Sequence, residues 1–262
     1  MLEELEEIKI EINMFLTDRE FWLNYWESHR EEILVKVPEK NMLAPVFDAA
    51  IRNSNIKNSC ELGGFPGTYS IYLRKKYGLD TTLVDYIIHQ DILNEMLTIN
   101  ELNSSELGLI EADIFNYEPT TSYELVFSIG LIEHFESTEK VISLHIPYIK
   151  PGGTLVIFLP NFRGVNGWFQ RKFDSENYGK HNISSMDVDL LRGICKKLGL
   201  EDVQVNWFGR FGVWLEREHQ KSKVARVLKK VTWLLGKVIF KVIPIDTKLF
   251  SPYIVLTAKR KM

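Results

Sequence analysis

The feature that most constrains the fold is a glycine-rich segment with an acidic residue at a set distance behind it. Residues 61–68 read Glu-Leu-Gly-Gly-Phe-Pro-Gly-Thr, and Asp85 follows 18 positions after Gly67. Glycine lets a backbone turn tightly and approach a ligand closely, because it has no Cβ. In Rossmann-like sheets, an acid about 20 residues beyond such a turn accepts hydrogen bonds from ribose hydroxyls. The spacing predicts a strand ending at Leu62, a helix over 68–77 and a nucleotide-type cofactor site.

The register of the glycines indicates which cofactor is bound. The dinucleotide pattern G-x-G-x-x-G needs glycines at positions 63, 65 and 68. The chain has Gly63, Phe65 and Thr68 there. An NAD site is therefore disfavoured.

The segment resembles motif I of the class I S-adenosylmethionine-dependent methyltransferases, acid-x-G-x-G-x-G. Glu61, Gly63 and Gly67 match this pattern, whereas Phe65 replaces the middle glycine. We expect Gly64 to supply the close backbone approach instead.

Three downstream segments extend the resemblance, which covers roughly residues 57–160. Residues 111–115 resemble the end of the third strand, where the acid, here Asp113, accepts from the adenine amino group. Residues 123–135 are similar to the fourth strand and the next helix in the branch that includes ubiquinone and menaquinone biosynthesis methyltransferases. Lys-Pro-Gly-Gly at 150–153 is similar to the turn before strand five.

The resemblance implies S-adenosylmethionine as the cofactor. The residues that we expect to bind it are Glu61, Gly63, Gly64, Gly67, Asp85, Tyr86, Asp113, Ile114 and Ser128.

The hydrophobic runs predict an α/β fold with a Rossmann-like, doubly wound, mostly parallel sheet. The expected strands cover 58–62, 81–85, 107–112, 123–128, 154–159, 203–208 and 251–258, and a helix covers 185–198. The resemblance implies that the last of these seven strands is antiparallel. We predict an N-terminal helical cap over 1–50 and a methyltransferase domain over 51–262.

Apolar and aromatic residues recur at helical spacing through residues 3–36. We interpret this cap as a lid in which Trp22 and Trp26 contact the substrate. The alternative is ordinary core packing, because aromatic stripes at this spacing are usually buried.

The connection over 160–183 is our main candidate for a substrate loop. Loops beyond about 12–15 residues are usually functional or disordered, and the aromatic content here argues against disorder. It leaves the carboxyl end of strand five, where open α/β sheets bind ligands. Asn161, Arg163 and Arg171 are the expected acceptor contacts, although solvated charges are the commoner explanation for such arginines.

Methyl transfer from a sulfonium depends mainly on alignment, and a general base matters only when the nucleophile arrives protonated. His134 is the first candidate base, oriented by Glu133 or Asp113, and His181 is the second. Alternatively, Glu133 and His134 only begin a helix and shape the cofactor pocket. We predict no metal, because no cluster of His, Cys or carboxylate residues has the ligand spacing of known sites.

Composition narrows the class of protein. The 262 residues are 45% hydrophobic with a formal net charge of −3, which fits one large domain and does not indicate nucleic-acid binding. Cys60 and Cys195 form no C-x-x-C motif, and the N-terminus is acidic, unlike a signal peptide. We expect a cytoplasmic protein.

Residues 216–243 predict a basic amphipathic helix. Its apolar stripe consists of Val224, Val227, Leu228, Val231, Leu234, Leu235, Val238, Ile239 and Val242. Such helices mostly pack against protein, either their own domain or a homodimer partner. The alternative is peripheral contact with the inner face of a membrane.

These observations predict a methyltransferase acting on a small-molecule, sugar or lipid-linked acceptor. Two alternatives stay open, an NAD-dependent oxidoreductase or epimerase and a non-catalytic, membrane-associated scaffold that binds the cofactor.

Overall fold

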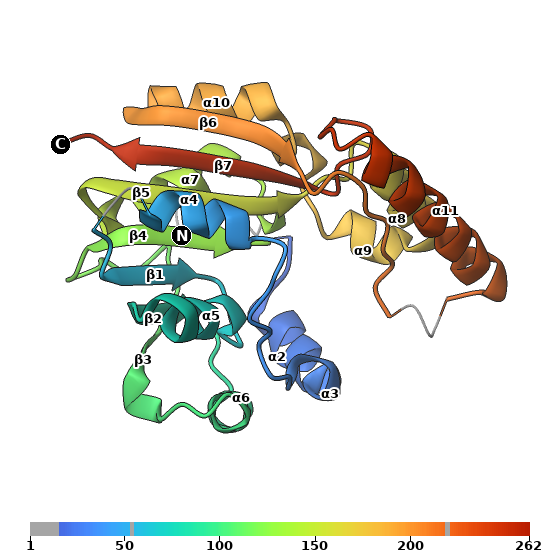
Figure 1. The fold of residues 1–262 in the computed structure, drawn as a ribbon. Helices are drawn as coiled ribbons and strands as arrows, with labels where there is room; N and C mark the ends of the chain where they lie inside the picture. The colour runs from blue at the N-terminus through green and yellow to red at the C-terminus, as the bar shows by residue number, and fades with distance from the viewer. Residues whose placement is uncertain (1–15, 53–54, 218–220) are drawn as a thin grey trace, which may run out of the picture.

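A seven-stranded sheet forms the centre of the computed structural model, which describes residues 16–52, 55–217 and 221–262. The strand order is β3-β2-β1-β4-β5-β7-β6. The strands are β1 Asn58–Leu62, β2 Asp80–Asp85, β3 Leu107–Glu111, β4 Tyr123–Ile129, β5 Ile149–Pro160, β6 Leu200–Phe208 and β7 Tyr253–Arg260. β1 to β5 pair in parallel, and β7 pairs antiparallel with β5 and β6. The predicted sheet and its antiparallel last strand are confirmed (Figure 1).

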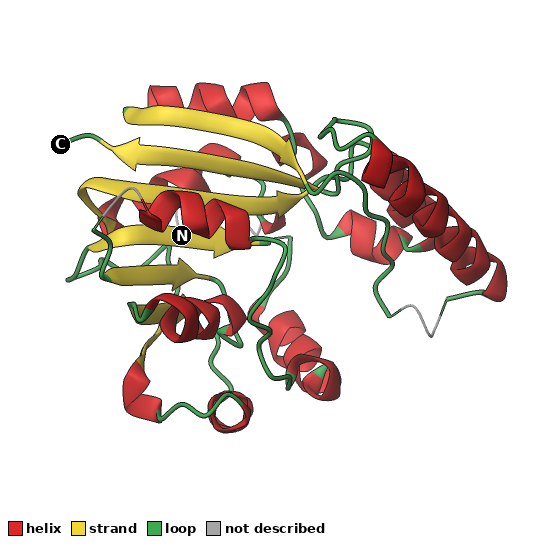
Figure 2. Cartoon of the chain, in the orientation of Figure 1, coloured by secondary structure: helices red, strands yellow, loops and turns green. Residues whose placement is uncertain are grey.

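Helices cover both faces of the sheet (Figures 1 and 2). α4 (Ala44–Arg52), α5 (Thr68–Tyr77) and α6 (Gln90–Ile99) cover one face, and α7 (Thr138–His145) and α10 (Val188–Lys197) cover the other. Side chains alternate between the two cores, as the pleat requires. In β4, Leu125 and Phe127 face the first set of helices and Val126 faces the second. Short 3-10 turns lie at Ser104–Glu106 (η1), Ile132–His134 (η2), Ile146–Tyr148 (η3) and Ile183–Ser185 (η4).

The N-terminal helices lie beyond the carboxyl ends of the parallel strands (Figure 1). α2 (Arg19–Ser28) begins at Asp18, whose carboxylate accepts a hydrogen bond of 2.7 Å from the Phe21 amide. α3 (Arg30–Ile33) follows, and Arg30 pairs with Asp91 and Glu95 on α6. Residues 1–15 of the predicted cap lie outside the described residues.

The predicted substrate loop over 160–183 is largely helical. It contains α8 (Val165–Phe173) and α9 (Ser175–Gly179). The helices form because Phe169 is buried in a third, small core with Val213 and Leu215. The expected helix over 185–198 is α10, which starts at Val188 with Asp187 as its N-cap.

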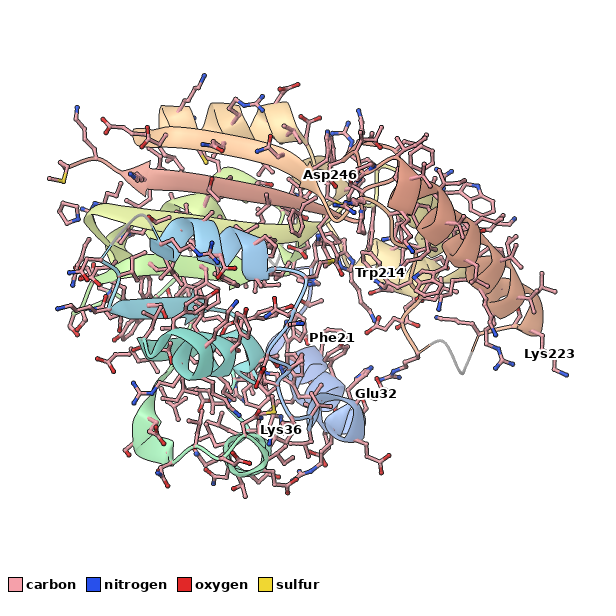
Figure 3. All side chains as sticks on the ribbon, in the orientation of Figure 1. Phe21, Glu32, Lys36, Trp214, Lys223 and Asp246 are labelled. Atoms are coloured by element: carbon pink, nitrogen blue, oxygen red, sulfur yellow. The ribbon has the colours of Figure 1, made fainter. Side chains whose placement is uncertain are left out.

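α11 (Lys223–Val242) corresponds to the amphipathic helix predicted over 216–243. Residues 218–220 of that predicted range are not described. It projects from the end of the sheet where β1, β4 and β5 terminate (Figure 1), with Lys223 at its outer end (Figure 3). The expectation that its apolar stripe packs against its own domain is wrong, because all nine of those side chains are exposed. Ala225, Gly236 and Phe240 make the contact with the domain instead. Among the described helices, none is long and apolar enough to cross a membrane.

Candidate functional site

A cavity of about 210 Å³ opens at the carboxyl ends of the parallel strands. Its walls include the glycine turn after β1, the ends of β2 and β4, the turn after β3, and α2. Seven of the nine residues expected to bind the cofactor line it, namely Glu61, Gly63, Gly64, Asp85, Tyr86, Asp113 and Ile114. Trp22, Trp26 and His134 line it as well. The fold therefore brings most of the predicted cofactor site to one place.

The glycine turn has the conformation that its sequence requires. Gly63 and Gly67 adopt φ of 63° and 88°, in the left-handed region that favours glycine. Gly67 begins α5 and does not line the cavity. A Cβ at Gly64 would lie 2.2 Å from Cδ of Glu61, so Gly64 makes its close approach to Glu61.

Glu61 joins the end of β1 to α5. Its Oε2 accepts hydrogen bonds from the Ser70 amide (2.9 Å) and the Ser70 hydroxyl (2.7 Å). Burial raises the pKa of Glu61 to about 8, because the charged form is poorly solvated there. The carboxyl group of Glu61 therefore connects β1 to the first turn of α5, and Glu61 also lines the cavity.

Two further acids are held at strand ends by backbone amides. Asp85 accepts from the Phe65 amide (2.9 Å) and the Ile87 amide (3.1 Å), and burial raises its pKa to about 6. Asp113 accepts from the Phe115 amide (2.9 Å). These bonds orient both carboxyl groups, and both groups line the cavity.

Phe65, which replaces the middle glycine of motif I, attaches the N-terminal cap to the turn. It is buried, and its ring centroid lies 5.3 Å from that of Trp26 on α2. Trp26 stacks on Trp22 at 5.7 Å, and both tryptophans line the cavity. α2 therefore packs against the glycine turn and also lies over the cavity, as expected of a lid.

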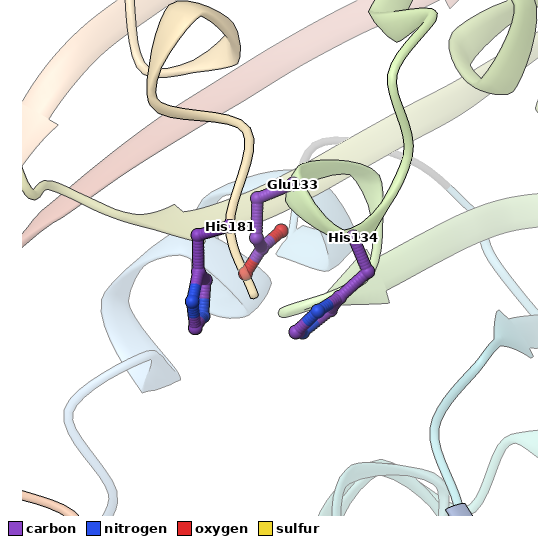
Figure 4. Close-up of side chains that lie close together, drawn as sticks. All are labelled: Glu133, His134 and His181. Carbon is purple, nitrogen blue, oxygen red and sulfur yellow. The ribbon is translucent and has the colours of Figure 1, made fainter. Parts of the chain in front are cut away.

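Glu133, His134 and His181 lie close together beside the cavity, although 47 residues separate the two histidines in the chain (Figure 4). The ring centroids of His134 and His181 are 4.8 Å apart. His134 lines the cavity and meets Trp22 edge-on at 5.2 Å.

The environment of the two histidines keeps them neutral. Burial lowers the pKa of His134 to about 3 and also lowers the pKa of His181. The Nδ1 of His134 lies 3.1 Å from the Lys180 carbonyl oxygen, and that of His181 lies 2.7 Å from the Asn177 carbonyl oxygen. A carbonyl only accepts, so we assign the proton to Nδ1 in each ring. The Lys180 carbonyl, rather than Glu133 or Asp113 as predicted, orients His134.

Besides Gly67, Glu133 and His181, four predicted residues lie outside the cavity lining. Ser128 is buried beneath the strand end, 2.9 Å from Nε2 of His145. Asn161 is buried and donates to the carbonyls of Lys248 and Ser251, so it fastens β5 to the segment before β7. Arg163 pairs with Asp187, and Arg171 is exposed on α8. The chain turns into α8 soon after β5, which takes Asn161, Arg163 and Arg171 out of the site.

A second cavity, of about 420 Å³, was missed from the sequence. Phe21, Asn24, Tyr25 and Ser28 of α2 form one side, and the other lining residues are Asp174, Glu176, Asn177, Lys180, Glu216, Arg217 and Lys221. It adjoins the histidines through Asn177 and Lys180, whose carbonyls hold the two rings. Residues 174–180 belong to the predicted substrate loop, but the residues predicted there to act were Asn161, Arg163, Arg171 and His181, and none of these lines this cavity.

Comparisons with known proteins add a family and a fold. A family profile described as a methyltransferase domain matches residues 27–205. No curated protein matches the chain by sequence.

Solved structures share the fold at low identity. Phosphoethanolamine N-methyltransferase 2 of Haemonchus contortus, in complex with S-adenosyl-L-methionine, has a TM-score of 0.58 and 17% identity, covering 84% of this chain and 52% of that one. This chain thus spans about half the length of that protein. An S-adenosylmethionine-dependent methyltransferase from Archaeoglobus fulgidus has a TM-score of 0.55 and 17% identity over 92% and 100% of the two chains. An O-methyltransferase family protein from Burkholderia thailandensis has a TM-score of 0.56 and 14% identity over 90% and 59%.

Proposed function

The chain belongs to the methyltransferase family matched over residues 27–205, and we propose that it transfers a methyl group from S-adenosylmethionine to a hydroxyl group of a sugar-type acceptor. An NAD-dependent oxidoreductase is not supported, because both the glycine register and the family point to methyl transfer.

The observation that carries the cofactor assignment is the convergence of the motif residues on one cavity. Asp85, at the end of β2, and Asp113, after β3, both line it, which supports the expected roles of Asp85 toward the ribose hydroxyls and of Asp113 toward the adenine amino group. The aromatic rings of Trp22 and Trp26 close the cavity from the α2 side. His134, which follows β4, also lines the cavity, so groups after β4 border the proposed cofactor site.

The second cavity supports a polyhydroxylated acceptor. Its lining offers amide, hydroxyl and charged groups of both signs, together with the rings of Phe21 and Tyr25. Such groups donate to and accept from hydroxyls without requiring a net charge on the ligand. Because two of its lining residues, Asn177 and Lys180, contact the rings of His181 and His134, an acceptor bound there lies beside the two histidines.

Calorimetry with S-adenosylhomocysteine tests the cofactor site. Asp85→Ala removes a charged acceptor worth about 1.5–3 kcal/mol, so we expect the affinity to fall at least about tenfold. Asp80→Ala, at the exposed opposite end of the same strand, is the matched control and should bind normally. Equal affinities in the two variants would remove the basis of the proposal.

Steady-state kinetics test the acceptor site. With a panel of sugars and sugar nucleotides as acceptors, Asn177→Ala should raise the KM for the acceptor and leave the affinity for S-adenosylhomocysteine unchanged, because Asn177 lines only the second cavity. An unaltered KM on an accepted sugar would place the acceptor elsewhere.

A further inference from the structure

Glu133, His134 and His181 bring three potential metal ligands together. One ligand atom from each lies within 4.8 Å of the others (Figure 4). Asn182 stabilises the arrangement. Its backbone amide donates to the Glu133 carbonyl (2.6 Å), and its side-chain amide donates to the Phe135 carbonyl (2.9 Å). The segment after α9 is thereby joined to η2, so the cluster is part of the folded structure.

Both imidazoles are oriented as metal ligands are. In metal sites, the ring N–H that does not face the metal is usually donated to a carbonyl, carboxylate or water, which fixes the tautomer. Here the Nδ1 atoms of both rings are engaged by backbone carbonyls, of Lys180 and Asn177. The two Nε2 lone pairs are left for a ligand.

The third member of the cluster carries an unsatisfied polar atom. Glu133 is 1% exposed, and its Oε2 is buried without a hydrogen-bond partner. Buried polar atoms in native proteins usually have a partner, so this oxygen is available to a ligand. A cation between Glu133 and the histidines supplies such a partner.

We propose that Glu133, His134 and His181 bind a divalent transition-metal ion beside the cofactor cavity. Two histidines and one glutamate are the protein ligands of one class of catalytic zinc sites, which keep a position open. The ligand atoms lie up to 4.8 Å apart, whereas a tetrahedral site with bonds of about 2.1 Å needs roughly 3.4 Å, so metal binding must draw the three side chains together.

The role of the ion in catalysis rests on the proposed function, whereas its binding does not. A coordinated hydroxyl ionises more readily. The acceptor hydroxyl then loses its proton to water, and its oxygen bonds to the methyl carbon as the carbon–sulfur bond breaks. The sulfonium keeps that electron pair and leaves as a neutral thioether.

Titration with Co²⁺ tests the site, because visible absorption bands report nitrogen and oxygen ligands. We expect one Co²⁺ per chain, displaced by Zn²⁺. His181→Gln and Glu133→Gln should each weaken binding at least about tenfold. His89→Gln alters a partly buried histidine outside the cluster and should bind as the parent does.

Calorimetry with S-adenosylhomocysteine on the same variants separates the metal from the cofactor. Retained cofactor binding with lost Co²⁺ bands supports the metal site. Absence of the bands in the parent protein, or equal Co²⁺ affinity in His181→Gln and His89→Gln, overturns it and leaves the cofactor assignment intact.

The exposed face of α11 supports a second inference, from an independent observation. Val224, Val238 and Val242 are 71%, 66% and 80% exposed. The apolar surface continues beyond the helix through Ile243, Ile245 and Leu249, which are all exposed. Contiguous apolar surface of this kind usually marks an interaction site.

The opposite side of α11 determines which way this face points. At Gly236 a Cβ would lie 2.1 Å from Cε1 of Phe211, so the helix lies directly on that ring. Phe240 stacks on Phe211 at 5.5 Å and lies 5.0 Å from Phe250. Because this side is packed, the apolar stripe faces outward.

The charge of α11 indicates what covers the stripe. The helix carries Lys223, Arg226, Lys229, Lys230, Lys237 and Lys241 and has no acidic residue, although the whole chain has a net charge of −3. In a two-fold dimer through this face, the helix would meet its own copy and bring lysines together. An anionic lipid surface complements both the basic residues and the apolar stripe.

We propose that α11 binds an anionic membrane surface through this stripe. Co-sedimentation with vesicles of phosphatidylglycerol and phosphatidylcholine should pellet the protein at low salt, and vesicles of phosphatidylcholine alone should pellet much less. Val227→Gln with Val238→Gln should lower the partition coefficient at least about tenfold.

A charge-matched pair of variants controls for net charge. Lys230→Glu with Lys241→Glu should weaken binding, whereas Lys57→Glu with Lys261→Glu, outside α11, should not. Protein that stays in the supernatant with anionic vesicles overturns the proposal. So does a dimer in solution that the Val227 and Val238 changes dissociate.

Discussion

At the scale of single residues, the pKa values of two glutamates near opposite ends of β1, Glu61 and Glu124, are shifted in opposite directions. Glu61 is buried at the carboxyl end, and desolvation raises its pKa to about 8. Glu124, in β4, accepts from the Lys57 and Asn58 amides where β1 begins, and those bonds lower its pKa. The cavity end of the strand therefore holds a carboxyl group that resists ionisation, at some expense of stability.

The first prediction concerns the pH dependence of stability. A raised folded-state pKa means that the native protein binds the proton more tightly, so the contribution of Glu61 to the unfolding free energy falls as pH rises from about 4.5 to about 8. Glu61→Gln keeps an acceptor for Ser70 and has no charge. Urea unfolding should show the variant gaining on the parent by on the order of 2 kcal/mol between pH 5 and pH 8.

Glu124→Gln is the matched control of opposite sign. Its carboxylate is stabilised in the native state, so the variant should lose stability relative to the parent as pH rises up to about 4.5, and the difference should then stay constant between pH 5 and pH 8. Parallel behaviour of the two variants would show that the burial of Glu61 is not the cause.

At the scale of elements, α2 connects three parts of the site. Trp26 contacts Phe65 of the glycine turn, Trp22 meets His134, and Lys180 lies 4.6 Å over the ring of Phe21. The first two contacts involve cavity-lining residues, and the third borders the second cavity. Cofactor binding should therefore oppose local opening of α2.

The second prediction concerns hydrogen exchange in α2. Openings that remove Trp22 and Trp26 from the cavity destroy the binding site, so a ligand suppresses them by mass action. At 100 times the Kd of S-adenosylhomocysteine, exchange in α2 should slow by up to about 100-fold. Mass spectrometry should show little change in the hydrogen exchange of α10, which packs on β6. Equal protection of α2 and α10 would argue against a lid.

At the scale of the whole molecule, α11 is attached through a small contact separate from the two main cores. Phe240 is 8% exposed between Phe211 and Phe250, whereas Val238, two residues away, is 66% exposed. Two apolar residues of one helix therefore differ in what they contribute to stability.

The third prediction uses this difference. Phe240→Ala removes a buried ring and should cost about 3 kcal/mol in the unfolding free energy of α11. Val238→Gln changes an exposed side chain and should alter stability by less than about 0.5 kcal/mol. Circular dichroism during urea unfolding measures both. A large loss in Val238→Gln that depends on protein concentration would instead indicate a dimer through the stripe.

Local patterns were sufficient for the sheet and for most of the cofactor cavity. The apolar runs predicted all seven strands, and the glycine spacing located Asp85 and the turn at 63–67. These features depend on neighbouring residues, since glycine adopts the left-handed turn without steric cost and parallel strands must end at the same edge of the sheet. A local rule can therefore be recognised in sequence.

The features that depend on distant contacts were decided only in the tertiary structure. Asn161 was expected to bind substrate, but it hydrogen-bonds to Lys248, 87 residues away. His134 and His181 meet because Asn182 joins the segment after α9 to η2. The outward direction of the α11 stripe follows from the packing of Gly236 on Phe211. The sequence by itself determined which side chains could do chemistry, and long-range packing decided which of them face one another, because no local pattern records a partner so far along the chain.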